Sequence, residues 1–190
     1  GPHYDSPILY ILVVEQNFEA YLDGQLVYRF GDLDNVAARR FLGNRTHPIS
    51  LPQDYAGKTL TLRIFSNYAD IGVGGEVRIG SAFALFSTML REDAADAAIG
   101  SILCALGLFA IGLFLLQRDE AGFLYYGGFA LSMGIWLLCQ MQSRTHLMNA
   151  PLRLFTIEVF ALYLAVAFLL RFVLQLFGRG PFGLTRIFSY

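Results

Sequence analysis

The sequence predicts a β-sandwich domain followed by an α-helical membrane bundle. Of its 190 residues, 55% are hydrophobic and 15% are charged, which is more apolar than an ordinary soluble domain. Residues 97–117 carry no charge, and their length matches the ~20 residues that a helix needs to cross a bilayer. The residues before them alternate between apolar and polar side chains and contain frequent turn residues, which is typical of strands. We therefore expect a β domain at residues 3–93 and a membrane region at residues 94–190.

Three patterns predict the strands of the β domain. Residues 8–14 form an apolar, β-branched run that is long enough for one buried strand. Asp23-Gly24 lies between two further runs and predicts a hairpin, because a type I′ turn needs positive φ at both central residues. Residues 59–65 alternate with a period of two. The side chains expected on one face of that strand are those of Leu60, Leu62 and Ile64.

Further strands are expected at residues 47–51, 76–79 and 82–87, with a turn at the glycine cluster of residues 72–75. Six or seven short strands, separated by turns at intervals of about 8 to 12 residues, favour a β-sandwich. A complete sandwich usually takes ~100 residues or more. We therefore expect one or two strands to be missing at the N-terminus of this domain.

The membrane region contains three apolar segments, at about residues 97–117, 121–143 and 152–177. The connections between them are short, so neighbouring helices should be antiparallel. If the β domain lies outside, the first loop and the C-terminus lie inside. This orientation places more arginines inside than outside, in the direction of the positive-inside rule. The arginines expected at or near the inner side are Arg118, Arg171, Arg179 and Arg186.

Glu158 is the intramembrane side chain of greatest interest. It lies about six residues into the third segment, or ~9 Å along a helix. A carboxylate at that depth should avoid lipid, and such groups often have functional roles. The alternative is a neutral carboxyl that is hydrogen-bonded to a neighbouring helix near Trp136 or Gln140. The sequence leaves both interpretations open.

Candidate ligand-binding residues in the β domain are aromatic or basic. Tyr21, Tyr28 and Tyr68 could form a platform on which a sugar stacks, although strand aromatics more often pack in a core. Arg39 and Arg40 could bind an anion, with a solvated loop pair as the alternative. These residues are the only sequence-based indication of a ligand.

Charge and cysteine placement exclude several other functions. Residues 1–96 contain eight basic and twelve acidic residues, a net charge of −4, which disfavours a nucleic-acid surface. Cys104 and Cys139 both lie in apolar segments, so the sequence contains no metal-ligand spacing. It also lacks a Cys-His or Ser-His-Asp arrangement. We therefore expect no metal, no cofactor and no enzymatic activity within these residues.

Several segments resemble one bacterial receptor family. The segment QRDEAGFLYY at residues 117–126 resembles the first cytoplasmic turn of the bacterial seven-transmembrane receptors with diverse intracellular signalling modules. GIWLLCQ at residues 134–140 and IEVF at residues 157–160 resemble the second and third helices of that family. FEAYLDGQLVYRFG at residues 18–31 and LTLRIFS at residues 60–66 resemble its jelly-roll, galactose-binding-like ectodomain.

The resemblance implies a signal-transduction receptor in the bacterial inner membrane, with an extracytoplasmic N-terminal domain. Such a receptor passes ligand binding through its helices to a cytoplasmic effector, frequently a diguanylate cyclase or a histidine kinase. Only three of the seven helices are present, and these 190 residues contain neither a GGDEF signature nor a kinase phosphoacceptor region. The expected partners are the lipid bilayer, an extracytoplasmic ligand such as a carbohydrate, and a second copy of the chain.

Two other functions remain open at this level. The chain could be a membrane-anchored module that binds glycan or protein without signalling. It could also be a transporter or membrane enzyme that uses Glu158, although a single intramembrane acid without a paired base makes this the weakest hypothesis. For the receptor hypothesis, we expect the signal to pass through residues 90–96 as a short connector before the first span.

Overall fold

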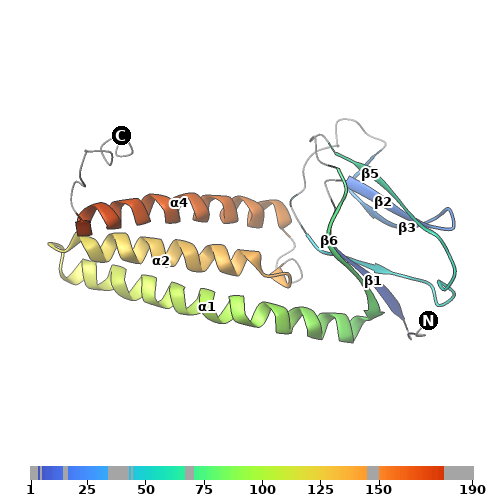
Figure 1. The fold of residues 1–190 in the computed structure, drawn as a ribbon, viewed down its shortest axis with the longest axis horizontal. Helices are drawn as coiled ribbons and strands as arrows, with labels where there is room; N and C mark the ends of the chain where they lie inside the picture. Colours follow the sequence, from blue (N-terminus) through green and yellow to red (C-terminus); the bar gives the residue numbers. More distant parts are fainter. Residues whose placement is uncertain are drawn as a thin grey trace. The chain divides into compact units, whose positions relative to one another are not determined.

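The computed structural model describes residues 4, 6–14, 17–33, 43, 45–66, 71–144 and 150–177. The chain forms two units. The first consists of residues 1–93 and 142–155, and the second of residues 94–141 and 156–190. Helix α1 (Ala82–Leu116) belongs to both units, because residues 82–93 lie in the first and the remainder lies in the second. Figure 1 shows this order of strands followed by long helices.

In the first unit, the described strands form two antiparallel sheets of three strands each. One sheet has the order β4-β1-β6 and the other has the order β3-β2-β5. The predicted β domain ahead of a helical region is therefore confirmed. The strands are β1 (Pro7–Val14), β2 (Asn17–Leu22), β3 (Gln25–Phe30), β4 (His47–Ser50), β5 (Leu60–Phe65) and β6 (Val73–Ser81).

The hairpin between β2 and β3 turns at the predicted dipeptide. Asp23 and Gly24 have φ values of 47° and 80°, as a type I′ turn requires. The turn is also joined to the residue before β5, because the Thr59 amide donates a 2.9 Å hydrogen bond to Asp23 Oδ1. This contact helps to hold β5 beside β2 in the register that pairs Leu22 with Leu60.

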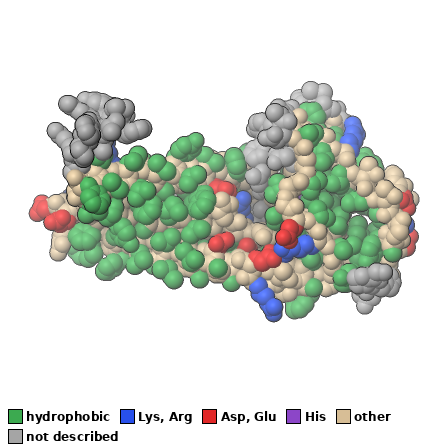
Figure 2. Space-filling model, viewed as in Figure 1, with side chains coloured by type: hydrophobic (Ala, Val, Ile, Leu, Met, Phe, Trp, Pro, Cys, Tyr) green, Lys and Arg blue, Asp and Glu red, His purple; other side chains and the backbone are tan. Residues whose placement is uncertain are grey.

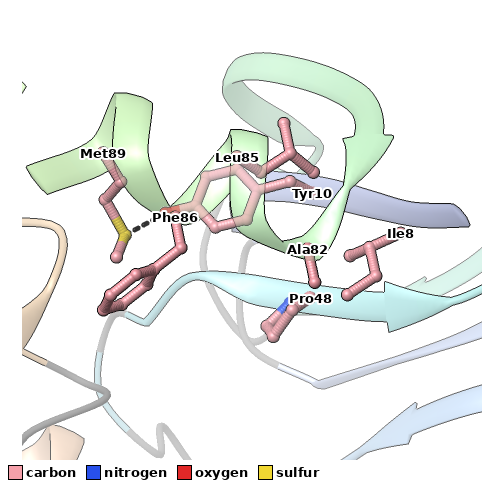
Figure 3. Close-up of a pocket in the computed structure, with 7 residues that line it drawn as sticks. All are labelled: Ile8, Tyr10, Pro48, Ala82, Leu85, Phe86 and Met89. Atoms are coloured by element: carbon pink, nitrogen blue, oxygen red, sulfur yellow. Dashed lines mark hydrogen bonds between the residues drawn. The ribbon is translucent and has the colours of Figure 1, made fainter. Parts of the chain in front are cut away.

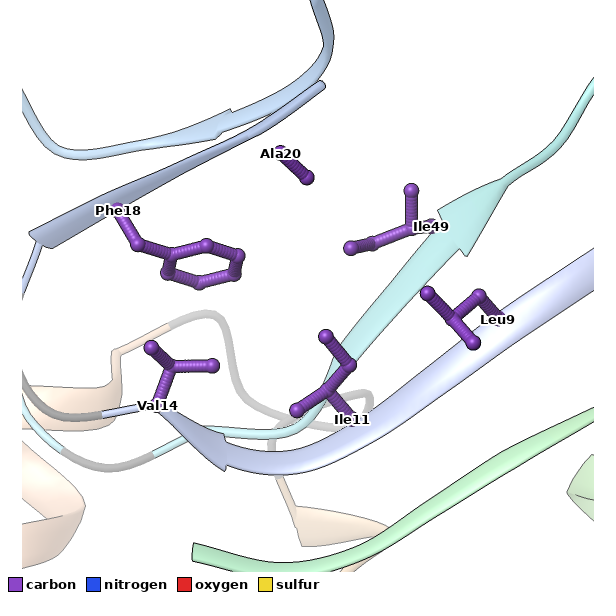
Figure 4. Packing of buried hydrophobic residues seen from close by; sticks show 6 residues of the cluster. All are labelled: Leu9, Ile11, Val14, Phe18, Ala20 and Ile49. Atoms are coloured by element: carbon purple, nitrogen blue, oxygen red, sulfur yellow. The ribbon is translucent and has the colours of Figure 1, made fainter. Parts of the chain in front are cut away.

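The core of the β domain contains side chains from both sheets (Figure 4). Phe18 of β2 is fully buried, and Leu9, Ile11 and Val14 of β1 belong to the same cluster. The buried members of this cluster are Leu9, Ile11, Val14, Phe18, Ala20 and Ile49. Leu60, Leu62 and Ile64 pack against the cluster from β5, which confirms that these three share one face.

The prediction of a strand at residues 82–87 is wrong, because α1 begins directly after β6. Ser81 caps the helix, since its Oγ accepts a 3.3 Å hydrogen bond from the Ala84 amide. The next buried positions are Met89 and Asp93, at helical spacing. Residues 90–96, expected to form a connector, are therefore part of one continuous helix.

The glycine cluster at residues 72–75 is not a simple turn, because Gly74 and Gly75 belong to β6. Two steps along β1, from Ile11 to Val13, correspond to three steps along β6, from Val77 to Gly74, which is a β-bulge. Gly75 has φ +75°, and a Cβ there would lie 2.5 Å from Leu12 Cδ2. Only glycine fits this position, so the cluster serves the strand geometry.

Among the described residues, three helices are long and apolar enough to cross a membrane, which supports the predicted membrane region. They are α1, α2 (Ala121–Gln140) and α4 (Pro151–Phe177). Figure 2 shows hydrophobic side chains covering these helices, as expected for surfaces that face lipid. The 35 residues of α1 extend over about 52 Å, which exceeds a hydrocarbon core of about 30 Å. The helix is therefore longer than a perpendicular crossing requires, and its charged residues lie within 91–96, before the uncharged part.

Within the second unit, α1 and α2 are in close contact at paired glycines. A Cβ on Gly107 would lie 2.8 Å from the Gly127 carbonyl oxygen, and one on Gly134 would lie 2.7 Å from that of Gly100. The pairs are seven residues apart on both helices and run in opposite directions, so α1 and α2 are antiparallel. Glycine at these positions lets the two backbones touch.

Candidate functional site

The first turns of α1 are held by polar groups from β1, β6 and the chain after α2, all within the first unit. We call this set the polar cluster and define it as Tyr10, Arg78, Glu92, Asp93 and Gln142. Its members come from three separate parts of the sequence. The cluster therefore joins elements whose proximity cannot be predicted from local sequence patterns.

Arg78 of β6 links the sheet to α1. Its guanidinium lies 2.9 Å from Glu92 Oε1, and its Nε donates a 2.6 Å hydrogen bond to Glu76 Oε2. Hydrogen bonds to these two carboxylates, Glu92 first, raise the pKa of Arg78 above its usual value. All three side chains are at least partly exposed, so the pairing contributes little to stability and mainly selects a geometry.

Asp93 makes the most buried polar contact of the cluster. Its side chain is 4% exposed, and its two oxygens accept hydrogen bonds from consecutive backbone amides. Oδ1 accepts from Gln142 at 2.8 Å, and Oδ2 accepts from Ser143 at 2.7 Å. Both amides belong to the residues that follow Met141, the C-cap residue of α2. One carboxylate thus attaches α1 to the segment that leaves α2.

Tyr10 completes the cluster from β1. Its hydroxyl lies 3.2 Å from Met89 Sδ and 3.4 Å from Gln142 Oε1, and it can donate its single proton to one of them at a time. Burial raises the pKa of Tyr10, a hydrogen bond with Thr46 and the charge of Arg78 oppose this rise, and the carboxylates of Asp93 and Glu92 add to it. The hydroxyl is therefore protonated at neutral pH and acts as a hydrogen-bond donor.

Tyr10 lines two cavities. The first has a volume of about 250 Å³ and is lined by apolar residues of β1, β4 and α1 (Figure 3). The second has a volume of about 340 Å³ and adjoins the polar cluster. Its lining residues are Tyr10, Leu12, Gly75, Glu76, Arg78, Glu92 and Gln142. Both cavities are lined in part by residues of α1, so a molecule bound in either one would contact this helix directly.

The start of α4 also contacts the β domain within the first unit. Gly43 has φ +91°, and a Cβ there would lie 2.4 Å from the backbone of Pro151. The backbone of α4 therefore touches a loop of the β domain where only glycine leaves room. Together with the Asp93 hydrogen bonds, this contact brings both ends of the α2–α4 connection to the β domain.

Tyr21, a predicted ligand residue, lies in a different cluster on the outer face of the β3-β2-β5 sheet. Its hydroxyl donates a 2.6 Å hydrogen bond to Glu19, which is 0% exposed. Glu19 also pairs with its two cross-strand neighbours, Arg29 at 2.7 Å and Arg63 at 3.3 Å. The Tyr21 hydrogen bond lowers the pKa of Glu19, the two arginines lower it further, and burial opposes them.

The proposed tyrosine platform is not assembled by the described residues. Tyr28 lies on the opposite face of the sheet from Tyr21, because its ring packs 5.6 Å from that of buried Phe18. Its hydroxyl lies 3.1 Å from His47 Nδ1 in the core. The remaining predicted ligand residues, Arg39, Arg40 and Tyr68, lie outside the described residues.

The predicted intramembrane residues lie on two helices. Glu158 is half-buried on α4, Trp136 is half-buried on α2, and Gln140 is exposed at the end of α2. Along α4, Glu158 falls between buried Leu154 and Ala161 at spacings of four and three residues. It therefore lies on the packed side of α4, consistent with a carboxyl that avoids lipid.

Sequence reasoning missed Asp93 and Arg78 as site residues. The signal for Asp93 was its position in the run Arg91-Glu92-Asp93, immediately before the uncharged span. A charge run at that point is usually solvated, and only burial of one member distinguishes it. No comparable signal identified Arg78.

No known family matches this chain when it is compared with family models. Comparisons with curated proteins and with solved structures also give no match.

Proposed function

We propose that this chain is the sensing and membrane part of a bacterial signal-transduction receptor. In this proposal, the β domain is a jelly-roll, galactose-binding-like module outside the inner membrane, of the kind found in seven-transmembrane receptors with intracellular signalling modules. Ligand binding to it shifts α1, and the helices pass the change to a cytoplasmic effector, a diguanylate cyclase or a histidine kinase, outside these 190 residues.

The observation that carries the proposal is the direct passage from β6 into α1. Strand β6 ends at Ser81 and α1 begins at Ala82, so no flexible linker separates the sheet from the membrane helix. A displacement of β6 is thereby applied to the first turn of α1. A simple anchor has no need for such a stiff junction, since a flexible linker would tether a binding module equally well.

The polar cluster supplies a set of contacts that could differ between two states. Arg78 pairs with both Glu76 and Glu92, and the Tyr10 hydroxyl lies within reach of two acceptors. A ligand that favours one arrangement shifts the equilibrium by its differential affinity for the two arrangements, and by no more than that. The cluster is thus the element on which we expect a ligand to act.

The test compares two acids on α1 in the complete receptor gene, with effector output as the readout. Asp93→Asn keeps the shape of the side chain, but its amide nitrogen cannot accept a hydrogen bond from a backbone amide. Asp96→Asn is the matched control, because Asp96 takes no part in the two Asp93 hydrogen bonds. We expect Asp93→Asn to change basal output by about fivefold or more and Asp96→Asn to change it little.

Equal output from wild type and Asp93→Asn, at equal membrane levels, would contradict the receptor proposal. If the β domain also bound glycan or protein under these conditions, the anchored binding module would replace it. Labelling of a single cysteine placed at Gln25 in intact cells tests the orientation, since an impermeant thiol reagent should reach it from outside.

A further inference from the structure

The apolar cavity beside α1 has a lining of uniform chemistry (Figure 3). Seven residues form it, and none is charged: Ile8, Tyr10, Pro48, Ala82, Leu85, Phe86 and Met89. The Tyr10 hydroxyl is the single polar side-chain group among these seven, and it is directed at Met89 Sδ, 3.2 Å away. A charged or strongly polar molecule would therefore lose its hydration in this cavity without compensation.

The volume of the cavity suits a small molecule. An engineered apolar cavity of about 150 Å³ is large enough for benzene, and this one, which is partly open to its surroundings, measures about 250 Å³. Water needs two to four polar partners to be held in place, which this lining does not provide. Burial of apolar carbon is favourable, so a single aromatic ring or a short hydrocarbon chain gains most from this lining.

We propose that this cavity is a binding site for a small, uncharged, apolar molecule the size of one substituted aromatic ring. Four of the lining residues belong to α1, and the other three belong to β1 and β4. A bound molecule therefore touches the sheet and the first two turns of α1 at once. Its effect on signalling rests on the proposed function, whereas the binding itself does not.

The test uses the full chain in lipid nanodiscs, with ¹³C-labelled methionine methyl groups observed by NMR. Met89 lines the cavity and is 2% exposed, while Met133 lies on α2 and reports partitioning of the probe into the membrane. Toluene is the probe and benzoate, of similar size but charged, is its control. We expect a saturable toluene shift at the Met89 methyl that exceeds the shift at Met133, and no saturable shift with benzoate.

Two matched substitutions of alanine by leucine test whether the probe binds in this cavity. Ala82→Leu adds three carbons at the cavity wall, and Ala84→Leu makes the same change at an exposed position of the same helix outside the lining. Filling the cavity should weaken toluene binding by about tenfold or more, whereas Ala84→Leu should leave it within about twofold. Ile8→Phe fills the cavity from β1 and replaces Ala82→Leu if that variant does not fold.

Three results would overturn this inference: no saturable shift at Met89, parallel shifts at Met89 and Met133, or equal affinity in the filled and control variants. A saturable, Ala82-dependent shift supports it. If such binding left effector output of the complete receptor unchanged, the cavity would stand as a ligand site and the receptor proposal would fail instead. The two proposals therefore fail on different measurements.

Discussion

Asp93 Oδ2 accepts a 2.7 Å hydrogen bond from the backbone amide of Ser143, fifty residues further along the chain. Both residues are nearly inaccessible to solvent, at 4% and 3% exposure. Asp93 ends a run of three charged residues on α1, and it alone is buried among Arg91, Glu92 and Asp93. A buried carboxylate that accepts two backbone amides holds the chain more firmly than a surface ion pair does.

This contrast predicts unequal effects of two neighbouring alanine substitutions. Asp93→Ala leaves two amides without their acceptor and should lower the free energy of unfolding by about 2–4 kcal/mol. Glu92→Ala removes a partly exposed pair with Arg78 and should cost less than about 1 kcal/mol. Denaturant titration of both variants in the same detergent measures the difference. Equal losses would mean that the Asp93 hydrogen bonds contribute no more than the surface pair.

The glycine pairs between α1 and α2 predict a position-specific effect of added methyl groups. A Cβ at Gly107 would lie 2.6 Å from the Leu131 amide nitrogen, whereas none of the atoms around Gly112 comes within 4 Å. Gly107→Ala should therefore destabilise the bundle by about 1–3 kcal/mol, because the backbones must separate.

Gly112→Ala is the matched control on the same helix, and it should be neutral or slightly stabilising because alanine favours the helix by about 1 kcal/mol. Thermal unfolding of both variants, followed by circular dichroism, decides between the outcomes. A stable Gly107→Ala protein would contradict close contact of the two helices.

Buried His47 predicts acid sensitivity of the β domain. It is 1% exposed, with its ring 4.7 Å from those of Phe18 and Phe30, and burial lowers its pKa from 6.5 to about 3, with Arg45 acting in the same direction. The unfolded chain therefore takes up a proton first as the pH falls below 6.5. Stability is complete above that pH and declines below it, down to about pH 3.

The decline due to His47 should be at most about 1.4 kcal/mol per pH unit. Unfolding free energies at pH 7.5, 6.0 and 5.0 measure it, in a range where carboxylates such as Glu19 remain ionised. His47→Gln cannot be protonated and should remove this slope, although it also lowers stability at every pH. A slope that persists in His47→Gln would assign the acid sensitivity to other groups.

Substitution of Glu158 should change the effector output of the complete receptor without changing the fold. Glu158→Gln keeps the size of the side chain and replaces its carboxyl group, on the packed side of α4, by an amide that cannot ionise. In the complete receptor we expect basal output to change by about twofold to thirtyfold, which corresponds to a coupling energy of about 0.5–2 kcal/mol.

Tyr163→Phe is the control for Glu158, because Tyr163 is 72% exposed on the same helix. Unchanged output from Glu158→Gln at normal expression would remove Glu158 from the mechanism and leave the neutral, hydrogen-bonded interpretation. A transporter would instead lose flux in the same variant while its fold survived.

Local patterns were enough to predict most of the elements. Asp23-Gly24 predicted the hairpin because the type I′ turn places a steric demand on those two residues alone. The uncharged segments predicted the membrane helices because hydrocarbon excludes charge whatever the rest of the fold does. Each of these physical constraints acts on a short stretch of neighbouring residues, so it can be recognised in the sequence alone.

The sequence by itself therefore determined that a β domain precedes three membrane helices. Only the tertiary structure decided where α1 begins, because residues 82–86 are all apolar and fit a strand or a helix equally well. Packing of Leu85, Met89 and Asp93 along one side decided for the helix. Tertiary structure also brought Gln142 to Glu92, and Glu92 of α1 to Arg78 of β6, because such contacts depend on how whole elements pack and not on any local pattern.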